Sequence, residues 1–176
     1  AQMIRDQVLA TSGLLNRSIG GPSIKPYQPD GIWEVSSSGR GALAQYVQDH
    51  GKDLYRRGLY VFFKLTLPPP NMLIFDSSNR DACEVQRNRT NTPLQALVMM
   101  NDPAILEAAR VYSTNLINNA PNKGETDLIK TAFKKVLCRD ATADELKLLD
   151  EYYKEEFARF SEKKASAWIM SLEASS

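Results

Sequence analysis

The side chains best suited to chemistry are five arginines between residues 56 and 89: Arg56, Arg57, Arg80, Arg87 and Arg89. A guanidinium group keeps its charge and offers a planar fork of donors that matches a carboxylate or a sulfate. The group could therefore cradle an anionic ligand, such as a sulfated or carboxylated sugar. The arginines could instead hold a long loop in place through backbone carbonyls and three nearby acids: Asp76, Asp81 and Glu84. We favour this structural interpretation, because the backbone of a long ordered loop needs internal hydrogen bonds.

Aromatic and amide side chains accompany the arginines. Three aromatic residues could stack on sugar rings, or could anchor a proline-rich loop in the core: Tyr27, Trp33 and Tyr55. Four polar residues could form a recognition site, although such residues more often cap helices: Asn91, Gln95, Asn101 and Asp102. The candidate ligand-binding residues are therefore Arg56, Arg57, Arg80, Arg87, Arg89, Asn91, Trp33 and Tyr27.

Catalytic and metal sites have weaker support. Cys83 has arginines nearby that would favour its thiolate, but the single histidine, His50, falls in an exposed-looking QDHGKD turn. We therefore expect Cys83 to be buried and unreactive, either alone or bridged to Cys138. The paired acids Asp150-Glu151 and Glu155-Glu156 could serve glycoside hydrolysis, but they read as a solvated helix face. One histidine, distant cysteines and no CxxCH motif predict no metal and no heme site in this chain.

The first half of the chain predicts short elements and loops. Residues 2–16 carry apolar side chains at helical spacing, and a short helix over 42–49 is a further expectation. Residues 54–63 have roughly helical spacing but are rich in aromatic residues, so a helix is favoured and a strand remains an alternative. The prolines at 68–70 end that element. Residues 71–91 are predicted to form a long ordered loop that is pinned to the core.

The next segment carries two successive helix-start signals. Thr92 and Asp102 each precede a proline, which places a capping residue before a favoured first helical position. The pattern predicts a helix over 93–100, a break near Asn101 and a second helix from Pro103 to about Asn118.

The C-terminal part predicts a helical hairpin. An amphipathic stripe covers 125–138, and Thr142 with Glu145 fits the S/T-x-x-E capping box of a helix that runs to about Phe160. The turn at 139–141 should then join antiparallel helices whose apolar faces meet: Phe133, Val136 and Leu137 against Leu149, Tyr152 or Tyr153. The predicted fold is mainly α, an irregular bundle of about six helices with a long ordered loop and little or no sheet. It forms one domain over residues 1–176, with 123–176 as a C-terminal hairpin subregion.

Composition narrows the functional classes. The 176 residues are 43% hydrophobic and 24% charged, with a net charge of +1, as in an ordinary globular domain. Residues 52–92 carry seven basic and four acidic side chains, an excess too small for a nucleic-acid footprint. No apolar run approaches the ~20 residues of a membrane span. Because the sequence starts inside a helical pattern, we expect it to be a fragment of a longer domain.

The stretch YRRGLYVFFKLTLPPPNMLIFDSSNRDACEVQRNRTNTPLQALVMMNDP resembles one particular family, and IRDQVLATSGLLNRSIGGPSIKPYQPDGIW is similar to the same family. This is the C-terminal domain of unknown function in large bacterial proteins with a planctomycete-type cytochrome C module, the PSD-one family. The resemblance covers residues 1 to about 115 and continues weakly through CRDATADEL. It implies a periplasmic, secreted or cell-surface setting and a modular parent protein, whose heme would belong to another module. It implies no catalytic residues.

Two functional hypotheses follow. The first is a non-catalytic binding or interaction domain of a larger extracytoplasmic protein, with other domains of the parent protein and carbohydrate as expected partners. The second is part of an enzyme that acts on a polysaccharide, which could be anionic. A cleft with a strongly perturbed carboxylate would favour the enzyme, whereas internally satisfied arginines would favour a structural role.

Overall fold

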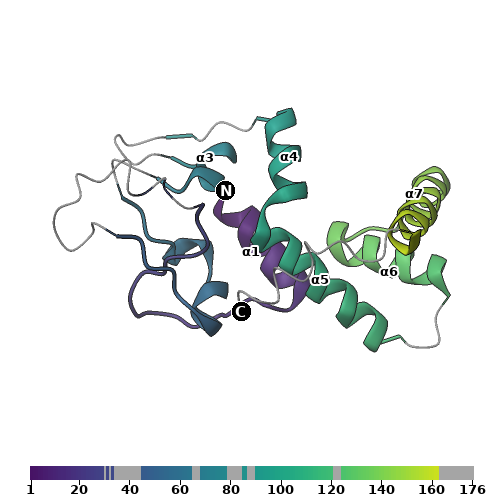
Figure 1. Ribbon diagram of the computed structural model, residues 1–176, viewed down its shortest axis with the longest axis horizontal. Helices are drawn as coiled ribbons and strands as arrows, with labels where there is room; N and C mark the ends of the chain where they lie inside the picture. The colour runs from purple at the N-terminus through teal and green to yellow at the C-terminus, as the bar shows by residue number, and fades with distance from the viewer. Residues whose placement is uncertain are drawn as a thin grey trace. The chain divides into compact units, whose positions relative to one another are not determined.

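The structure is a computed structural model of the 176-residue chain, and it describes residues 1–29, 31, 33, 45–64, 68–78, 85–86, 90–120 and 124–162. These residues form six α-helices and two short 3-10 helices, with isolated bridges in place of any strand (Figure 1). The prediction of a mainly α fold is therefore confirmed. The chain divides into two compact units, Ala1–Asn115 and Leu116–Ser176.

The first helix, α1 (Gln2–Ser12), is shorter than the sequence suggested. It ends at Gly13, whose φ of 89° lies in the left-handed region that glycine adopts without a steric penalty. The amide of Leu15 then donates to the carbonyl of Leu9 at 3.0 Å, which turns the chain away from the helix axis. Local apolar spacing beyond residue 12 therefore overstated the helix.

The helix expected over 54–63 is wrong. Two 3-10 helices, η1 (Gly51–Tyr55) and η2 (Gly58–Tyr60), occupy this region. The physical reason is a non-local pairing, in which Ile24 donates to the carbonyl of Tyr60 at 2.8 Å and accepts from the amide of Phe62 at 2.7 Å. Backbone groups that bond across to another segment cannot also form a helix. The helix suggested over 42–49 is also not seen in its described part, residues 45–49.

The core of the first unit forms around this pairing. Ile24, Val61 and Met72 are buried together, and Tyr60 and Phe63 pack against them. Met72 belongs to α3 (Pro70–Ile74), a short helix in a segment predicted to be loop. Proline stands at its first positions because the missing amide is not needed there. The expectation that this segment is pinned to the core is confirmed at Met72.

The tandem helices are present as predicted. Thr92 caps α4 (Pro93–Asn101) in a reciprocal box with Gln95, and both bonds measure 3.3 Å. Asp102 interrupts the helix and caps α5 (Pro103–Asn118), accepting from the amides of Ala104 at 2.9 Å and Ile105 at 3.3 Å.

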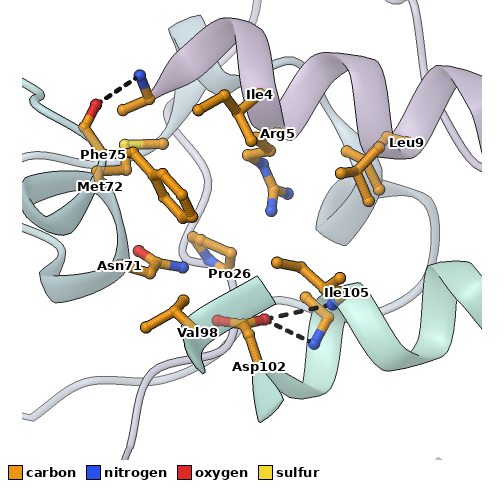
Figure 2. A pocket seen from close by; sticks show the side chains of 13 residues that line it. Ile4, Arg5, Leu9, Pro26, Asn71, Met72, Phe75, Val98, Asp102 and Ile105 are labelled. Atoms are coloured by element: carbon orange, nitrogen blue, oxygen red, sulfur yellow. Dashed lines mark hydrogen bonds between the residues drawn. The ribbon is translucent and has the colours of Figure 1, made fainter. Parts of the chain in front are cut away.

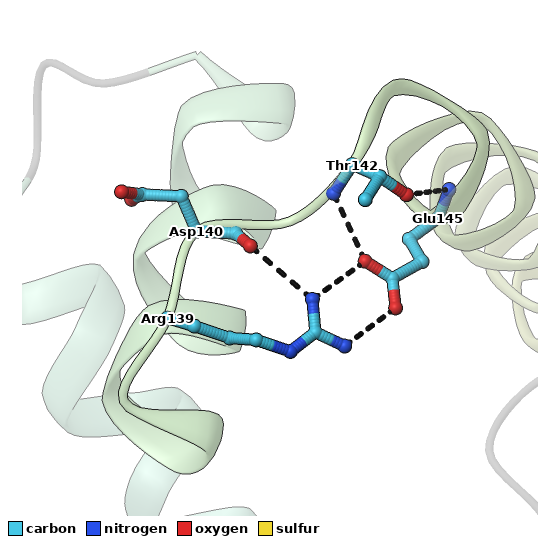
Figure 3. Close-up of polar contacts among 4 residues, drawn as sticks. All are labelled: Arg139, Asp140, Thr142 and Glu145. Carbon is cyan, nitrogen blue, oxygen red and sulfur yellow. Dashed lines mark hydrogen bonds and ion pairs between the residues drawn. The ribbon is translucent and has the colours of Figure 1, made fainter.

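The second unit contains α6 (Glu125–Leu137) and α7 (Ala143–Glu162), which contact each other. The capping box at Thr142 is confirmed. Arg139 donates two hydrogen bonds, of 2.9 and 2.7 Å, to the carboxylate of Glu145 (Figure 3). In Figure 1, α6 lies across the view and α7 is seen nearly along its axis, so the two helices cross. Leu137 and Tyr152 remain 50% and 61% exposed, so the apolar interface expected there is not closed at these two residues.

Candidate functional site

Arg56 is a structural arginine. Its side chain is buried, and it donates to the carbonyls of Pro22 and Gly20 while its guanidinium lies 4.0 Å from the ring centre of Tyr60. These contacts tie the glycine-rich turn at 20–22 to the core. They match the structural interpretation of the arginines, because the acceptors are backbone carbonyls within the chain.

The other described arginine of the group points elsewhere. Arg57 is half exposed, and its Nε lies 3.2 Å from Asp6 Oδ2 on α1. Asp6 also accepts from the amide of Gly58 at 2.6 Å. Arg56 and Arg57 therefore serve different segments. Arg80, Arg87 and Arg89 lie outside the described residues, as does Cys83, so the predictions for them stay predictions. Cys138 is a free, exposed thiol, so the alternative of a bridge to Cys138 is wrong.

Hydrogen bonds join Asp76 to Thr90, the described residues on the two sides of the segment that contains these arginines. Thr90 donates to the Asp76 carboxylate from its amide at 2.8 Å and from its hydroxyl at 2.9 Å. Gln95 joins the same network, donating to Thr90 Oγ1 and to the carbonyl of Ile74. The bonds from Thr90 lower the pKa of Asp76. Gln95 is thus a structural residue and not part of an open recognition site.

The remaining sequence candidates separate into core and surface. Trp33 is buried, with ring centres of Tyr46 and Phe62 at 5.1 and 5.9 Å and Lys64 Nζ 4.5 Å from its own. Asn91 is exposed. Tyr27 is 39% exposed and lines a pocket, as do two of the polar candidates, Asn101 and Asp102.

That pocket, here called the outer pocket, has a volume of about 510 Å³ and lies between the 26–29 segment, α3 and the junction of α4 with α5. Its apolar walls include two tyrosines and three aliphatic residues: Tyr27, Tyr46, Ile74, Leu97 and Val98. Its polar groups are Gln28, Asn71, Asn101 and Asp102. Largely apolar walls with a few convergent polar groups are typical of small-molecule sites.

A smaller cavity of about 50 Å³, the inner pocket, shares four lining residues with the outer pocket: Pro26, Asn71, Val98 and Asp102. Figure 2 shows Arg5 pointing into it from α1 and Asp102 on the opposite side, with the amide nitrogen of Asn71 directed inward. The two adjoining pockets are here called the chamber; Arg5 and Asp102 line its inner part, among mostly apolar residues.

Arg5 is an unusual lining residue because its charge is mostly buried and only partly satisfied. Its Nη2 donates to the carbonyl of Leu54 at 2.5 Å, whereas its Nε is buried and has no hydrogen-bond partner. Burial lowers the pKa of Arg5, and the negative charges of Asp6 and Asp102 oppose that shift. No ion pair joins Arg5 to Asp102. The chamber thus holds opposite charges that face each other without touching.

One neighbouring polar group also lacks a hydrogen-bond partner, and another is bonded within the wall. Gln28 Nε2 is buried without a hydrogen-bond partner. The hydroxyl of Tyr46 donates to the carbonyl of Pro26 at 2.5 Å, and burial raises the pKa of this tyrosine. That bond holds one wall of the chamber in place.

Comparison with known proteins identifies the family. The model of the PSD1 family, described as a protein of unknown function (DUF1553), matches residues 1–153. The chain belongs to this family. The PSD1 family is the planctomycete cytochrome C-associated domain family, so the resemblance noted in the sequence is confirmed. No curated protein and no solved structure matches the chain.

Within the described ranges, no group of three or more histidine, cysteine, aspartate or glutamate side chains is placed to hold a metal ion. Among the same residues, every helix is too short or too polar to span a bilayer.

The sequence pointed to part of this site and missed its charged centre. Tyr27, Asn101 and Asp102 were candidates, whereas Arg5, Gln28 and the proline walls were not considered. A signal for Arg5 existed, since it lies four residues before the buried Leu9 on the same face of α1. A cation on an apolar helical stripe is buried on folding, and a buried charge is costly unless an opposite charge or a ligand pairs with it. Asp102, the opposite charge that lines the same pocket, lies 97 positions away in the sequence, and local patterns do not reveal such long-range neighbours.

Proposed function

We propose that this PSD1 domain is a non-catalytic binding domain of a larger extracytoplasmic bacterial protein, and that its ligand occupies the outer pocket. The observation that carries the proposal is the pocket itself, a preformed concavity of about 510 Å³ within one compact unit. Its volume lies in the range typical of small-molecule sites. The other domains of the parent protein, including a heme-bearing module, would be the covalent partners of this domain.

The lining residues support binding more than catalysis. Hydrolysis of a glycosidic bond normally uses two carboxyl groups that flank the bond. Among the described residues that line the two pockets, Asp102 is the only carboxylate, and one of its oxygens is occupied by the cap of α5. The enzyme alternative therefore gains no specific support from this site.

Carbohydrate remains one ligand class to test. The exposed part of the Tyr27 ring offers a face on which a sugar could stack, and the amides of Asn71 and Asn101 could bond hydroxyl groups. An acidic sugar has less support, because neither Arg56 nor Arg57 lines the pocket and Asp102 would repel it.

The proposal is tested by a ligand panel read by NMR on the whole 176-residue chain. The panel contains neutral sugars, acidic sugars, free amino acids and short apolar peptides. A pocket ligand should shift the backbone amides of residues 26–29 and 97–102. Shifts confined to other parts of the chain would place the ligand elsewhere and contradict the proposal.

Two leucines of α4 provide a matched pair of variants. Leu97 and Leu94 are 55% and 53% exposed on the same helix, but only Leu97 lines the outer pocket. Leu97→Arg should weaken the pocket ligand by roughly ten-fold or more, because an arginine side chain fills and charges the rim. Leu94→Arg should bind as the wild type does. Equal affinities in the two variants would contradict the pocket as the binding site.

A further inference from the structure

We propose that the inner pocket binds the head group of a free α-amino acid, with its carboxylate on Arg5, its ammonium group on Asp102 and its side chain in the outer pocket. This inference rests on the proposed function and specifies the ligand class of the same site. It is carried by the opposed, unpaired charges of the chamber.

The Arg5 end is suited to a carboxylate. The guanidinium points into the inner pocket, its Nε is buried without a partner, and Nη1 makes no hydrogen bond to the described residues. A carboxylate can accept two parallel bonds from a guanidinium, which are stronger than bonds between neutral groups. The bond from Nη2 to Leu54 holds the group in place, so its donors are already oriented.

The Asp102 end is suited to an ammonium group. Its Oδ1 accepts from the amides of Ala104 and Ile105, which fixes the carboxylate at the start of α5. Its Oδ2 has no hydrogen-bond or ion-pair partner among the described residues. An oxygen of this kind accepts a charge-assisted bond at little further cost in ordering.

The balance of charge selects a zwitterion over an anion or a cation. Two charged side chains of opposite sign, Arg5 and Asp102, line the described part of the inner pocket, and the α-amino group of Ala1, which also lines it, already donates to the carbonyl of Phe75 at 2.9 Å. A simple anion would gain from Arg5 and be repelled by Asp102, and a simple cation would meet the reverse. A zwitterion satisfies both groups at once. Arg5 and Asp102 do not collapse onto each other, because Arg5 donates to the carbonyl of Leu54 and Asp102 accepts from the amides of Ala104 and Ile105.

The outer pocket then selects the side chain of the ligand. Its walls are largely apolar and include Ile74, Leu97 and the ring of Tyr27. A large apolar or aromatic side chain would displace water from these walls, which is favourable in proportion to the area covered. We therefore expect phenylalanine and leucine to bind more tightly than glycine or aspartate.

The test uses isothermal titration of the full chain with L-phenylalanine and two derivatives. N-acetyl-L-phenylalanine lacks the ammonium charge, and L-phenylalanine amide lacks the carboxylate. Each derivative should bind roughly ten-fold or more weakly than L-phenylalanine, the loss expected for one hydrogen bond to a charged group. Equal affinities for all three compounds would overturn the inference.

A variant at Asp102 separates recognition from folding. Asparagine is as good a helix cap as aspartate, so Asp102→Asn should keep α5 and remove only the charge. It should weaken L-phenylalanine by roughly ten-fold or more, whereas the anion N-acetyl-L-phenylalanine should bind no more weakly than to the wild type, because its repulsion by Asp102 is removed. Equal weakening of both compounds, or of neither, would overturn the assignment of the ammonium group.

The outcomes also distinguish this inference from the proposed function. If a sugar or a peptide shifts the pocket amides and is sensitive to Leu97→Arg, while amino acids do not bind, the binding function stands and this inference fails. If no member of the panel shifts the pocket amides, the proposed function fails as well.

Discussion

Two arginine–carboxylate couples in this chain differ in a way that separates structure from function. Arg139 and Glu145 are 51% and 36% exposed at the turn between α6 and α7, and two short bonds join them. Arg5 and Asp102 line the inner pocket, are each partly buried and are not joined. The exposed couple holds a turn and is complete, whereas the enclosed couple leaves donors and an acceptor unused. Unused charge in a cavity is costly unless something binds there, which is why the pocket carries the functional proposal.

The two capping boxes repeat the contrast. Thr92 pairs with Gln95 in the first unit, and Thr142 pairs with Glu145 in the second. Gln95 is buried and also bonds Ile74 and Thr90, whereas Glu145 is shared with a solvent-exposed arginine. The same four-residue signal therefore fixes a helix that lines the pocket in one unit and a surface turn in the other.

The largest expected effect is on stability, and it compares a glycine packed against α1 with a glycine that has open space around it. A Cβ on Gly58 would lie 3.0 Å from the Cα and 3.1 Å from the carbonyl oxygen of Gln2, whereas one on Gly124 would meet nothing within 4 Å. Gly58→Ala should lower the free energy of unfolding by about 1–3 kcal/mol, because the clash is with backbone. Gly124→Ala meets no atom but replaces the N-cap glycine of α6, so it should cost less, about 0.5–1 kcal/mol. Urea unfolding of both variants measures the difference, and equal losses would remove the contrast.

The second prediction compares the two boxes directly. Thr92→Ala should cost about 1 kcal/mol through loss of the cap, and Thr142→Ala should cost less because water can replace the lost bond at an exposed turn. Asn91→Ala, an exposed neighbour, serves as the control and should be nearly neutral. Denaturant midpoints of the three variants give the order. A larger loss in Thr142→Ala would show that the buried network around Gln95 adds nothing to the cap.

How far the sequence predicted the structure depends on the range of the interactions involved. The caps at Thr92, Asp102 and Thr142 were predicted correctly, because a cap depends on residues within one helical turn. The prediction of a helix over 54–63 was wrong, because Ile24 supplies backbone partners to Tyr60 and Phe62, which lie 36 and 38 residues further along the chain. The pocket was missed for the same reason. It combines α1, the 26–29 segment, α3 and the α4–α5 junction, and no local pattern encodes their meeting.

The third prediction concerns the pH dependence of stability that arises from the ion pair between Arg139 and Glu145. Bonds from Arg139 and Thr142 lower the pKa of Glu145 to about 2, compared with about 4.3 in an unfolded chain. A lowered carboxyl pKa stabilises the fold above the unfolded value, and the stabilisation is lost as pH falls from about 4.3 towards 2. Glu145→Gln should therefore lower the melting temperature at pH 6 by a small amount, and the difference should shrink at pH 3.

Carbon-detected NMR of the Glu145 carboxyl group gives an independent check of that pKa. Added salt should also reduce the difference between wild type and Glu145→Gln at pH 6, because both side chains are open to solvent. A difference that grows as the pH falls would contradict the direction assigned to the pKa shift.

The smallest expected effect on stability is that of Asp102→Asn, although Asp102 carries the charge proposed to bind the ammonium group of the ligand. Asp102→Asn keeps the acceptor that caps α5, so the free energy of unfolding should change by less than about 0.5 kcal/mol. If Asp102 instead stabilised the buried Arg5 strongly across the cavity, the variant would leave an uncompensated charge and lose about 3 kcal/mol or more. Urea unfolding decides between these values. A near-zero change together with weaker amino-acid binding would mean that the carboxylate is kept for a ligand, as the gap between Arg5 and Asp102 suggests. A large loss would make the enclosed couple a structural pair like Arg139 and Glu145, joined through the cavity and not by contact.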